Sequence, residues 1–210
     1  MNGLERMLAA VRFTPGDRPP VAPQLFGHAA RWCGIPLRDY VQDGALMADC
    51  QLRIQAHYGH DAVFAFMDFG LESEAIGSRL RFYEAQYPEI TDYVLPPGAD
   101  AGQLRLPDPT ADGRLPELLR GIARLRSALG DTTLVAGSLL GPMSLATQLY
   151  GMEAALFLAA DDPGRFEIAL DYATACAIRY GQAQIAAGAH LPVVFDPAAS
   201  PAVVPPAFFR

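Results

Sequence analysis

Four short apolar segments, each separated from the next by sequence of helical character, constrain the fold of this chain more than any other feature. They are VAPQLF (21–26), AVFAFM (62–67), TLVAGSLL (133–140) and LPVVF (191–195). Strands of a parallel sheet that are covered on both faces have such continuous apolar runs. Strands that alternate with helices form βαβ units. The sequence therefore predicts an α/β fold with a parallel sheet.

The intervening sequence carries helix patterns and helix end signals. Gly130 follows one periodic segment as a stop signal, and Pro142 stands where a proline is tolerated, in the first turn of a helix. The predicted helices cover residues 38–57, 115–130, two within 143–160, and 161–188. Residues 79–84 and 92–95 are expected to form an extended pair outside the main sheet.

Two architectures fit this pattern, an open doubly wound sheet and a (β/α)8 barrel. The chain contains neither G-x-G-x-x-G nor G-x-x-x-x-G-K-[ST], which disfavours nucleotide-binding open sheets. A barrel typically needs about 250 residues, and this chain has 210. We interpret residues 1–210 as the N-terminal portion of one barrel domain, about the first half of a (β/α)8 TIM barrel.

Composition excludes several classes of protein. The net charge is −7, lysine is absent and the arginines form no basic cluster, so we expect no nucleic-acid partner. No segment approaches the roughly 20 apolar residues of a membrane span, and no signal peptide pattern occurs. A cytoplasmic protein without membrane contact is expected. Cys33, Cys50 and Cys176 are too far apart for a zinc finger or a disulfide framework.

Polar residues follow each predicted strand, and the carboxyl ends of parallel strands are where ligands bind in both architectures. We expect these side chains to converge on one mouth that binds a small-molecule substrate. They are His28 and Arg31 after the first strand, Asp68, Glu72 and Glu74 after the second, Ser144 and Gln148 after the third, and Asp196 after the fourth.

Each candidate also has a structural interpretation. Asp68 directly follows an apolar strand, where burial raises a carboxyl pKa or a cationic ligand binds, but it is equally suited to capping a loop or helix. One of Glu72 and Glu74 is expected to face solvent, because two close carboxylates repel each other. Asp196 precedes a proline and suits a turn cap. His28 suits a polar site, and it equally suits packing under a loop.

Motifs for metal and nucleophilic chemistry are absent from the sequence. There is no H-E-x-x-H, no closely spaced Cys/His set and no G-x-S-x-G elbow. We therefore predict no metal site within these 210 residues. The residues by themselves indicate a polar pocket on an α/β scaffold and do not identify the reaction.

Three segments together resemble the uroporphyrinogen decarboxylase superfamily, and its cobamide-dependent methyltransferase branch more than the decarboxylases. They are FMDFGLESEAIG (66–77), LLGPMSLATQLYG (139–151) and AAGAHLPVVFDPAASPAVVPPAFF (186–209). The resemblance implies a (β/α)8 barrel enzyme with its cleft at the carboxyl ends of the strands. It further implies transfer of a methyl group from a corrinoid (cobamide) donor to a zinc-bound thiol or related acceptor, with a corrinoid protein as partner.

The decarboxylases, lyases of porphyrin biosynthesis that act on a tetrapyrrole, are the alternative. In them an aspartate matching Asp68 contacts the pyrrole nitrogens, which suits a charge-assisted hydrogen bond. The family's arginines after the first strand correspond here to Leu25 and Ala29, with Arg31 nearby, and a family tyrosine corresponds to Gln148. These departures favour the methyltransferase reading, and Asp68 is the candidate catalytic residue.

The zinc ligands of the methyltransferase branch are a His-x-Cys pair and a later Cys, which would lie past Arg210. Zinc is therefore expected only in a longer chain. A third reading is a non-catalytic, truncated ligand-binding fragment. Half a barrel exposes two strand edges, which proteins normally pair or cover, so this chain is expected to aggregate or to form a homodimer.

Overall fold

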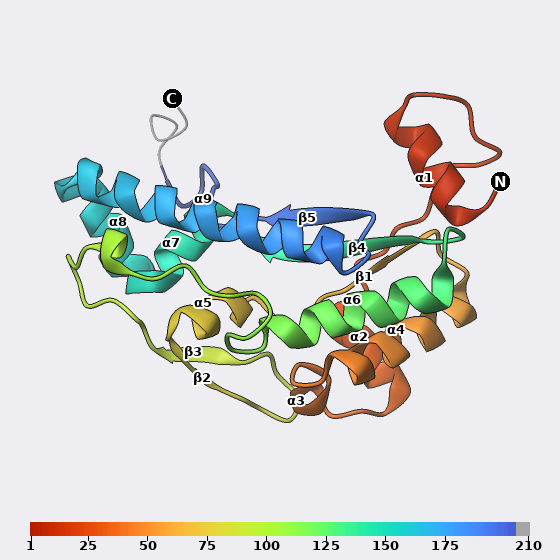
Figure 1. The fold of residues 1–210 in the computed structure, drawn as a ribbon, viewed down its shortest axis with the longest axis horizontal. Helices are drawn as coiled ribbons and strands as arrows, with labels where there is room; N and C mark the ends of the chain where they lie inside the picture. The colour runs from red at the N-terminus through yellow and green to blue at the C-terminus, as the bar shows by residue number, and fades with distance from the viewer. Residues whose placement is uncertain (205–210) are drawn as a thin grey trace.

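The computed structural model describes residues 1–204 and has an α/β architecture (Figure 1). Its main sheet contains three parallel strands, β1 (Ala62–Phe64), β4 (Leu134–Leu140) and β5 (Leu191–Phe195), in that spatial order. β4 lies in the centre and every one of its residues is buried, as its continuous apolar sequence predicts. The strand order follows the chain without reversal, which is the order of successive barrel strands.

The structure contains the second sheet and the predicted helices, and it adds helices that the sequence did not predict, among them α2 and α5. A small antiparallel pair, β2 (Arg79–Arg81) and β3 (Glu89–Asp92), lies apart from the main sheet. The remaining elements are α1 (Gly3–Val11), α2 (Phe26–Cys33), α3 (Leu37–Tyr40), α4 (Gly44–Tyr58), α5 (Leu71–Ile76), η1 (Ala101–Gln103), α6 (Leu115–Leu129), α7 (Pro142–Tyr150), α8 (Met152–Asp161) and α9 (Pro163–Ala186).

The strand predicted at residues 21–26 is wrong. Residues 21–25 have no regular structure and Phe26 begins α2. Pro20 and Pro23 lack the N–H groups that a ladder needs. What remains of a strand is one backbone bond, from the Asp61 N–H to the Val21 carbonyl at 2.8 Å.

Other predictions hold with shifted boundaries. The strand predicted at 62–67 stops after Phe64, and the second member of the extended pair begins at Glu89 rather than at residue 92. The helix predicted at 38–57 is broken into α3 and α4, because Asp43 caps a new helix with hydrogen bonds from the N–H groups of Ala45 and Leu46, at 2.8 and 3.0 Å.

The core is built from two main clusters on the helix-covered side of the sheet. One joins α2, α4 and α6 to β1 and β4, and the other joins α7, α8 and α9. α4 and α6 approach so closely that a Cβ atom on Gly44 would stand 1.7 Å from the carbonyl oxygen of Glu117. A larger residue at Gly44 would therefore separate the two helices.

The two ends of the sheet are covered differently. α1 lies at the amino ends of β1 and β4, where its Leu4 N–H donates to the Thr132 carbonyl at 3.2 Å, whereas α7 and α8 lie at the opposite end of the molecule (Figure 1). Within residues 1–204, none of the helices is long and apolar enough to cross a bilayer.

Candidate functional site

Three carboxylates follow β1 as predicted, and the structure brings all three into one region at its carboxyl end. Asp68 comes four residues after β1, and Glu72 and Glu74 lie on α5. The side chain of Asp68 is 1% exposed, and its Oδ1 accepts a hydrogen bond from the Gly70 N–H at 2.7 Å. This bond fixes the turn that leads from the strand into the helix.

Arg114, just before α6, binds two of these carboxylates. Its Nη1 lies 2.6 Å from Asp68 Oδ2 and its Nε lies 2.6 Å from Glu74 Oε2, while the Val41 carbonyl also accepts from Nη1. The guanidinium lies 4.8 Å from the centroid of the Phe82 ring. Burial opposes the charge of Arg114, but Asp68 and Glu74 raise its pKa above the ordinary value. The result is a buried ion triad.

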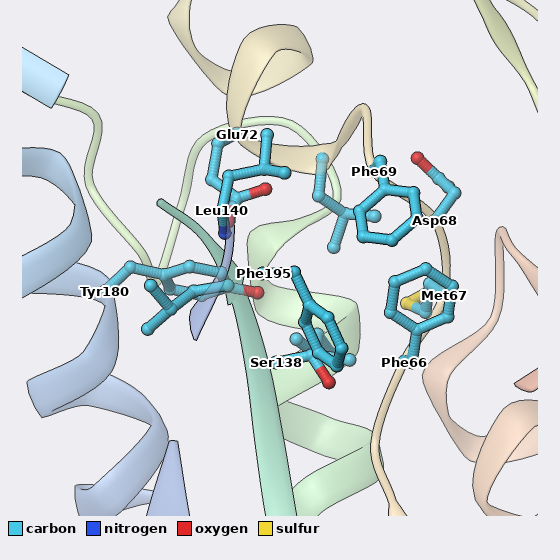
Figure 2. A pocket seen from close by; sticks show the side chains of 12 residues that line it. Phe66, Met67, Asp68, Phe69, Glu72, Ser138, Leu140, Tyr180 and Phe195 are labelled. Atoms are coloured by element: carbon cyan, nitrogen blue, oxygen red, sulfur yellow. The ribbon is translucent and has the colours of Figure 1, made fainter. Parts of the chain in front are cut away.

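Glu72 points to the other side of α5 and lacks such a partner. It is buried, and its Oε1 accepts a hydrogen bond from the Leu140 N–H, at the end of β4, at 2.8 Å. It lines a cavity of about 10 Å³ together with Ser138 of β4 and Tyr180 of α9 (Figure 2). Of the two glutamates, Glu74 is the more exposed, with 24% of its side chain open to solvent, but it is paired with Arg114 rather than facing solvent freely.

An aromatic cluster borders the same end of the sheet. Phe66 stacks on Phe26 with their ring centroids 4.1 Å apart and contacts Phe69 edge-on at 4.8 Å. Phe195, at the end of β5, lies 5.9 Å from Phe69 and 6.2 Å from Phe66. Phe69 is 40% exposed. The cluster gives the mouth an apolar, partly open aromatic wall beside the buried ion triad.

Asp196 and Ser144 are in contact at the start of α7. The Asp196 carboxylate accepts hydrogen bonds from the N–H groups of Met143 and Ser144, at 3.2 and 2.7 Å. A Cβ atom on Gly141 would stand 2.3 Å from the Asp196 side chain, so glycine is required for this approach. A carboxylate at a helix N-terminus is favourable, so Asp196 caps the start of α7, whereas the sequence suggested a turn cap.

Gln148 also turns toward α5. Its Oε1 accepts a hydrogen bond from the Ser73 hydroxyl at 2.5 Å. Gln148, Phe69 and Gly70 border a surface groove of about 480 Å³ that runs along β3. Gln148 thereby belongs to the rim of the mouth.

His28 and Arg31 do not join the carboxylates. Both are exposed on α2 and line a separate groove of about 580 Å³ with Glu84 and Tyr87. Tyr87 is shared by this groove and the one that contains Gln148. The predicted single mouth is therefore divided into neighbouring parts.

Sequence reasoning missed three residues of the site, Arg114, Ser138 and Tyr180. Arg114 precedes a helix and Tyr180 lies within α9. Candidate residues were expected at the carboxyl ends of strands, and neither residue lies there. Ser138 is a polar residue inside the apolar run TLVAGSLL, and that interruption was the one available signal. Arg114 carries the largest consequence, because it changes the charge of the whole region.

The described residues do not suit a metal ion. Within residues 1–204, no three His, Cys, Asp or Glu side chains are grouped so that they could hold one. The triad around Arg114 is instead held together by its own cation.

Comparison with known proteins gives a consistent family. A family model described as uroporphyrinogen decarboxylase (URO-D) matches residues 2–210. The chain is 28% identical to a methylcobamide:CoM methyltransferase MtaA from Methanosarcina barkeri, over 98% of this chain and 61% of that protein. It is 27% identical to a uroporphyrinogen decarboxylase from Erythrobacter litoralis, over 75% of this chain and 46% of that protein.

A solved structure agrees over the whole chain. A methyltransferase from Methanosarcina mazei superposes with a TM-score of 0.91 at 27% identity, covering 100% of this chain and 63% of that one. The chain thus spans about three fifths of these two methyltransferases. Its fold is part of a (β/α)8 barrel, as predicted. The third resembling segment, 186–209, agrees in position with β5, but residues 205–209 lie outside the described residues.

Proposed function

Because the chain belongs to the uroporphyrinogen decarboxylase family, we propose that it forms the substrate mouth of a cobamide-dependent methyltransferase. Such an enzyme moves a methyl group from a corrinoid to a thiol. The transfer forms an S–CH3 bond, leaves the electrons of the cobalt–carbon bond on the corrinoid and releases the thiol proton. The comparisons include methyltransferases and decarboxylases at similar identity, so the choice between them rests on the site.

The pairing of Asp68 with Arg114 is the observation that carries this proposal. In the decarboxylase reading, the Asp68 carboxylate has to meet the pyrrole N–H groups of a tetrapyrrole. Here its Oδ2 lies 2.6 Å from Arg114 Nη1 and its Oδ1 accepts the Gly70 N–H at 2.7 Å. Turning it toward a ligand would break this buried ion pair and leave Arg114 with Glu74 as its remaining carboxylate partner, and breaking a buried pair is unfavourable.

The apolar residues of α2 and of the segment before it also favour the methyltransferase over the decarboxylase. Ala29 is fully buried, and Leu25 packs against the same core cluster. An arginine at either position would have to displace core packing before it reached a ligand. The four or more acidic groups of a tetrapyrrole substrate would thus meet Arg31 and His28, in a separate groove, and little other positive charge.

The residues of this chain have distinct proposed roles at the mouth. Phe66, Phe69 and Phe195 would bind the apolar face of a large flat ligand, since aromatic rings favour such contacts. Gln148 would donate or accept a hydrogen bond at the rim. Asp68, now a positioning residue, holds Arg114 in place, and Asp196 with Ser144 holds the start of α7. His28 and Arg31 would bind an anionic group in the neighbouring groove, such as the acidic end of a thiol substrate.

The methyl donor, the protein partner and the oligomeric state are also proposals. The methyl donor is a corrinoid, carried by a corrinoid protein. Zinc would activate the thiol, but the described residues offer it no site, so no step here depends on it. A homodimer and a cytoplasmic location remain predictions. Val194 on β5 is 57% exposed, which is consistent with an apolar contact at that strand.

The test uses the natural polypeptide that contains this chain. We would incubate it with methylcobalamin, 2-mercaptoethanesulfonate and zinc, and follow the loss of methylcobalamin absorbance together with formation of the methylated thiol. In parallel, uroporphyrinogen would be supplied and its decarboxylation measured.

Methyl transfer without decarboxylation is the expected result. Decarboxylation of uroporphyrinogen would overturn the proposal and restore the alternative enzyme. Inactivity toward both, with methylcobalamin bound but unchanged, would make the chain a ligand-binding module instead.

The matched variant is Phe69→Leu, which removes the exposed ring but keeps an apolar side chain. It should weaken methylcobalamin binding about tenfold, given roughly 1.4 kcal/mol for an aromatic contact.

A further inference from the structure

The small cavity behind the mouth has polar groups from three separate elements in its wall. Its volume is about 10 Å³, which is about the space that one water molecule needs. Glu72 enters from α5, Ser138 from β4 and Tyr180 from α9 (Figure 2). Asp68 and Phe69, which border the mouth, also line it. The cavity therefore lies directly beside the candidate site.

Two hydroxyl groups in this wall lack a hydrogen bond. The Ser138 Oγ and the Tyr180 hydroxyl are buried and have no partner among the described residues. The Gln184 amide lies near the Tyr180 hydroxyl but not in hydrogen-bonding geometry. A buried polar group without a partner costs free energy, and ordered water is the usual remedy. These hydroxyls point to a bound water in the cavity.

Glu72 lacks compensation for a negative charge. It is 5% exposed, and the Leu140 N–H binds one of its oxygens. The nearest cation, Arg114, already binds Asp68, Glu74 and a backbone carbonyl. A buried carboxylate without a cation or several N–H donors is unfavourable, so the group takes up a proton. The protonated carboxyl group then has an O–H to donate.

The charged and titratable groups around Glu72 agree with this state. Burial raises the pKa of Glu72 to about 7, against the lowering effects of the backbone N–H groups of Leu140 and of Glu72 itself; the negative charge of Asp68 adds to the rise and Arg114 opposes it. Cys176 and Tyr180 face Glu72 from α9. Burial raises the pKa of Cys176 to about 11 and that of Tyr180 well above its ordinary value. Both are therefore neutral at neutral pH.

We propose that this cavity is a proton-holding site, in which Glu72 carries the proton and one water links its carboxyl group to the hydroxyls of Tyr180 and Ser138. The proton leaves Glu72 through this water to solvent water in the mouth, which carries it away as hydronium, and Glu72 is left as a carboxylate. The reverse transfer, from a thiol that becomes a thiolate, restores the acid. That use of the proton rests on the proposed function, whereas the site itself does not.

Infrared spectroscopy of the intact chain tests the protonated carboxyl group. The C=O stretch of a buried carboxylic acid should be present below neutrality and should disappear as the pH rises, with a midpoint of about 7. Glu72→Gln should abolish this band. Glu153→Gln, which changes an exposed glutamate of α8, is the matched control and should leave it unchanged. A wild-type chain without the band, or a band that survives in Glu72→Gln, would overturn the proposal.

The water link has its own test, which keeps Glu72 in place. Tyr180→Phe and Ser138→Ala should each shift the carboxylic acid band to higher frequency, because the acid loses part of its hydrogen-bonded network. An unshifted band in both variants would refute the link even if Glu72→Gln failed to fold. The band is independent of turnover. A chain that shows it but transfers no methyl group would contradict the proposed function and retain this site.

Discussion

Two buried aspartates border the same short strand, Asp61 just before β1 and Asp68 four residues after it, and their surroundings differ. Asp61 is fully compensated: its oxygens accept hydrogen bonds from Arg18 at 2.6 and 2.9 Å, from Arg6 at 3.0 Å and from the Val21 N–H at 2.8 Å. Burial opposes its ionisation, but these donors hold the pKa of Asp61 below the ordinary value.

The carboxyl end of β1 is less completely compensated. There one guanidinium, that of Arg114, serves both Asp68 and Glu74, and Glu72 has no cation of its own. In barrels the amino face serves stability and the carboxyl face carries the chemistry. The difference teaches that the carboxylates at the carboxyl end of β1 are less completely compensated than Asp61, although the amino end also holds a buried polar atom without a partner, His60 Nδ1.

The largest expected effect comes from removing the shared cation. Arg114→Met leaves Asp68 buried without a cation and should lower the free energy of unfolding by about 4 kcal/mol, the range found when one member of a buried pair is lost. Urea unfolding measures this. Arg120→Met, which removes an exposed arginine of α6, is the control and should change little. A loss below about 1 kcal/mol for Arg114→Met would contradict the buried triad.

Substitution of Glu72 should have the next largest effect, and it should stabilise the protein above neutral pH. Its folded pKa of about 7 exceeds the ordinary value of 4.5, so the native state binds more protons between these values. Stability linked to Glu72 is fully present below pH 4.5 and is lost as the pH rises through 7. Glu72→Gln should therefore be more stable than the wild type above neutrality, by up to about 3 kcal/mol.

Thermal unfolding of both proteins across this pH range measures the difference. The two curves should converge at acidic pH and separate above it. Parallel curves would mean that Glu72 is ionised in the native state, and the contrast between the two ends of β1 would then disappear.

Asp61→Asn should have a smaller effect at the amino end. The asparagine keeps one acceptor, and Arg18, 41% exposed, is free to turn to water, so we expect a loss of roughly 2 kcal/mol. Because the proposed mouth lies at the other end of β1, methylcobalamin binding should be unchanged at temperatures where the variant is folded. Weakened binding would show that the two ends of β1 are coupled.

Asp17→Asn should have the smallest effect. Asp17 accepts from Arg6 at 2.7 and 2.9 Å but is exposed, and solvent and salt weaken such pairs. The unfolding midpoint should fall by less than in Asp61→Asn, and the difference from the wild type should vanish at high salt. A salt-independent loss as large as that of Asp61→Asn would show that the outer pair acts as a buried one.

The sequence determined the elements of this protein wherever one local pattern dominates. The apolar runs at 133–140 and 191–195 became β4 and β5, and Gly130, Pro142 and Asp162 mark the helix ends where the structure has them. These signals act over a few residues, because they depend on the backbone geometry and the hydrogen-bond donors and acceptors of neighbouring residues. The failure at 21–26 is also local, since Pro20 and Pro23 remove N–H groups that a strand would need despite the apolar sequence.

Only the tertiary structure decided which polar groups share one environment. Asp68 and Arg114 are 46 residues apart in the chain, and Glu72 and Tyr180 come from different helices. The sequence placed Asp68, Glu72 and Glu74 at a strand end, but whether each meets a cation, a backbone N–H or an empty cavity depends on how α6 and α9 pack. Charge compensation depends on distance in space, and that distance is set by packing rather than by position along the chain.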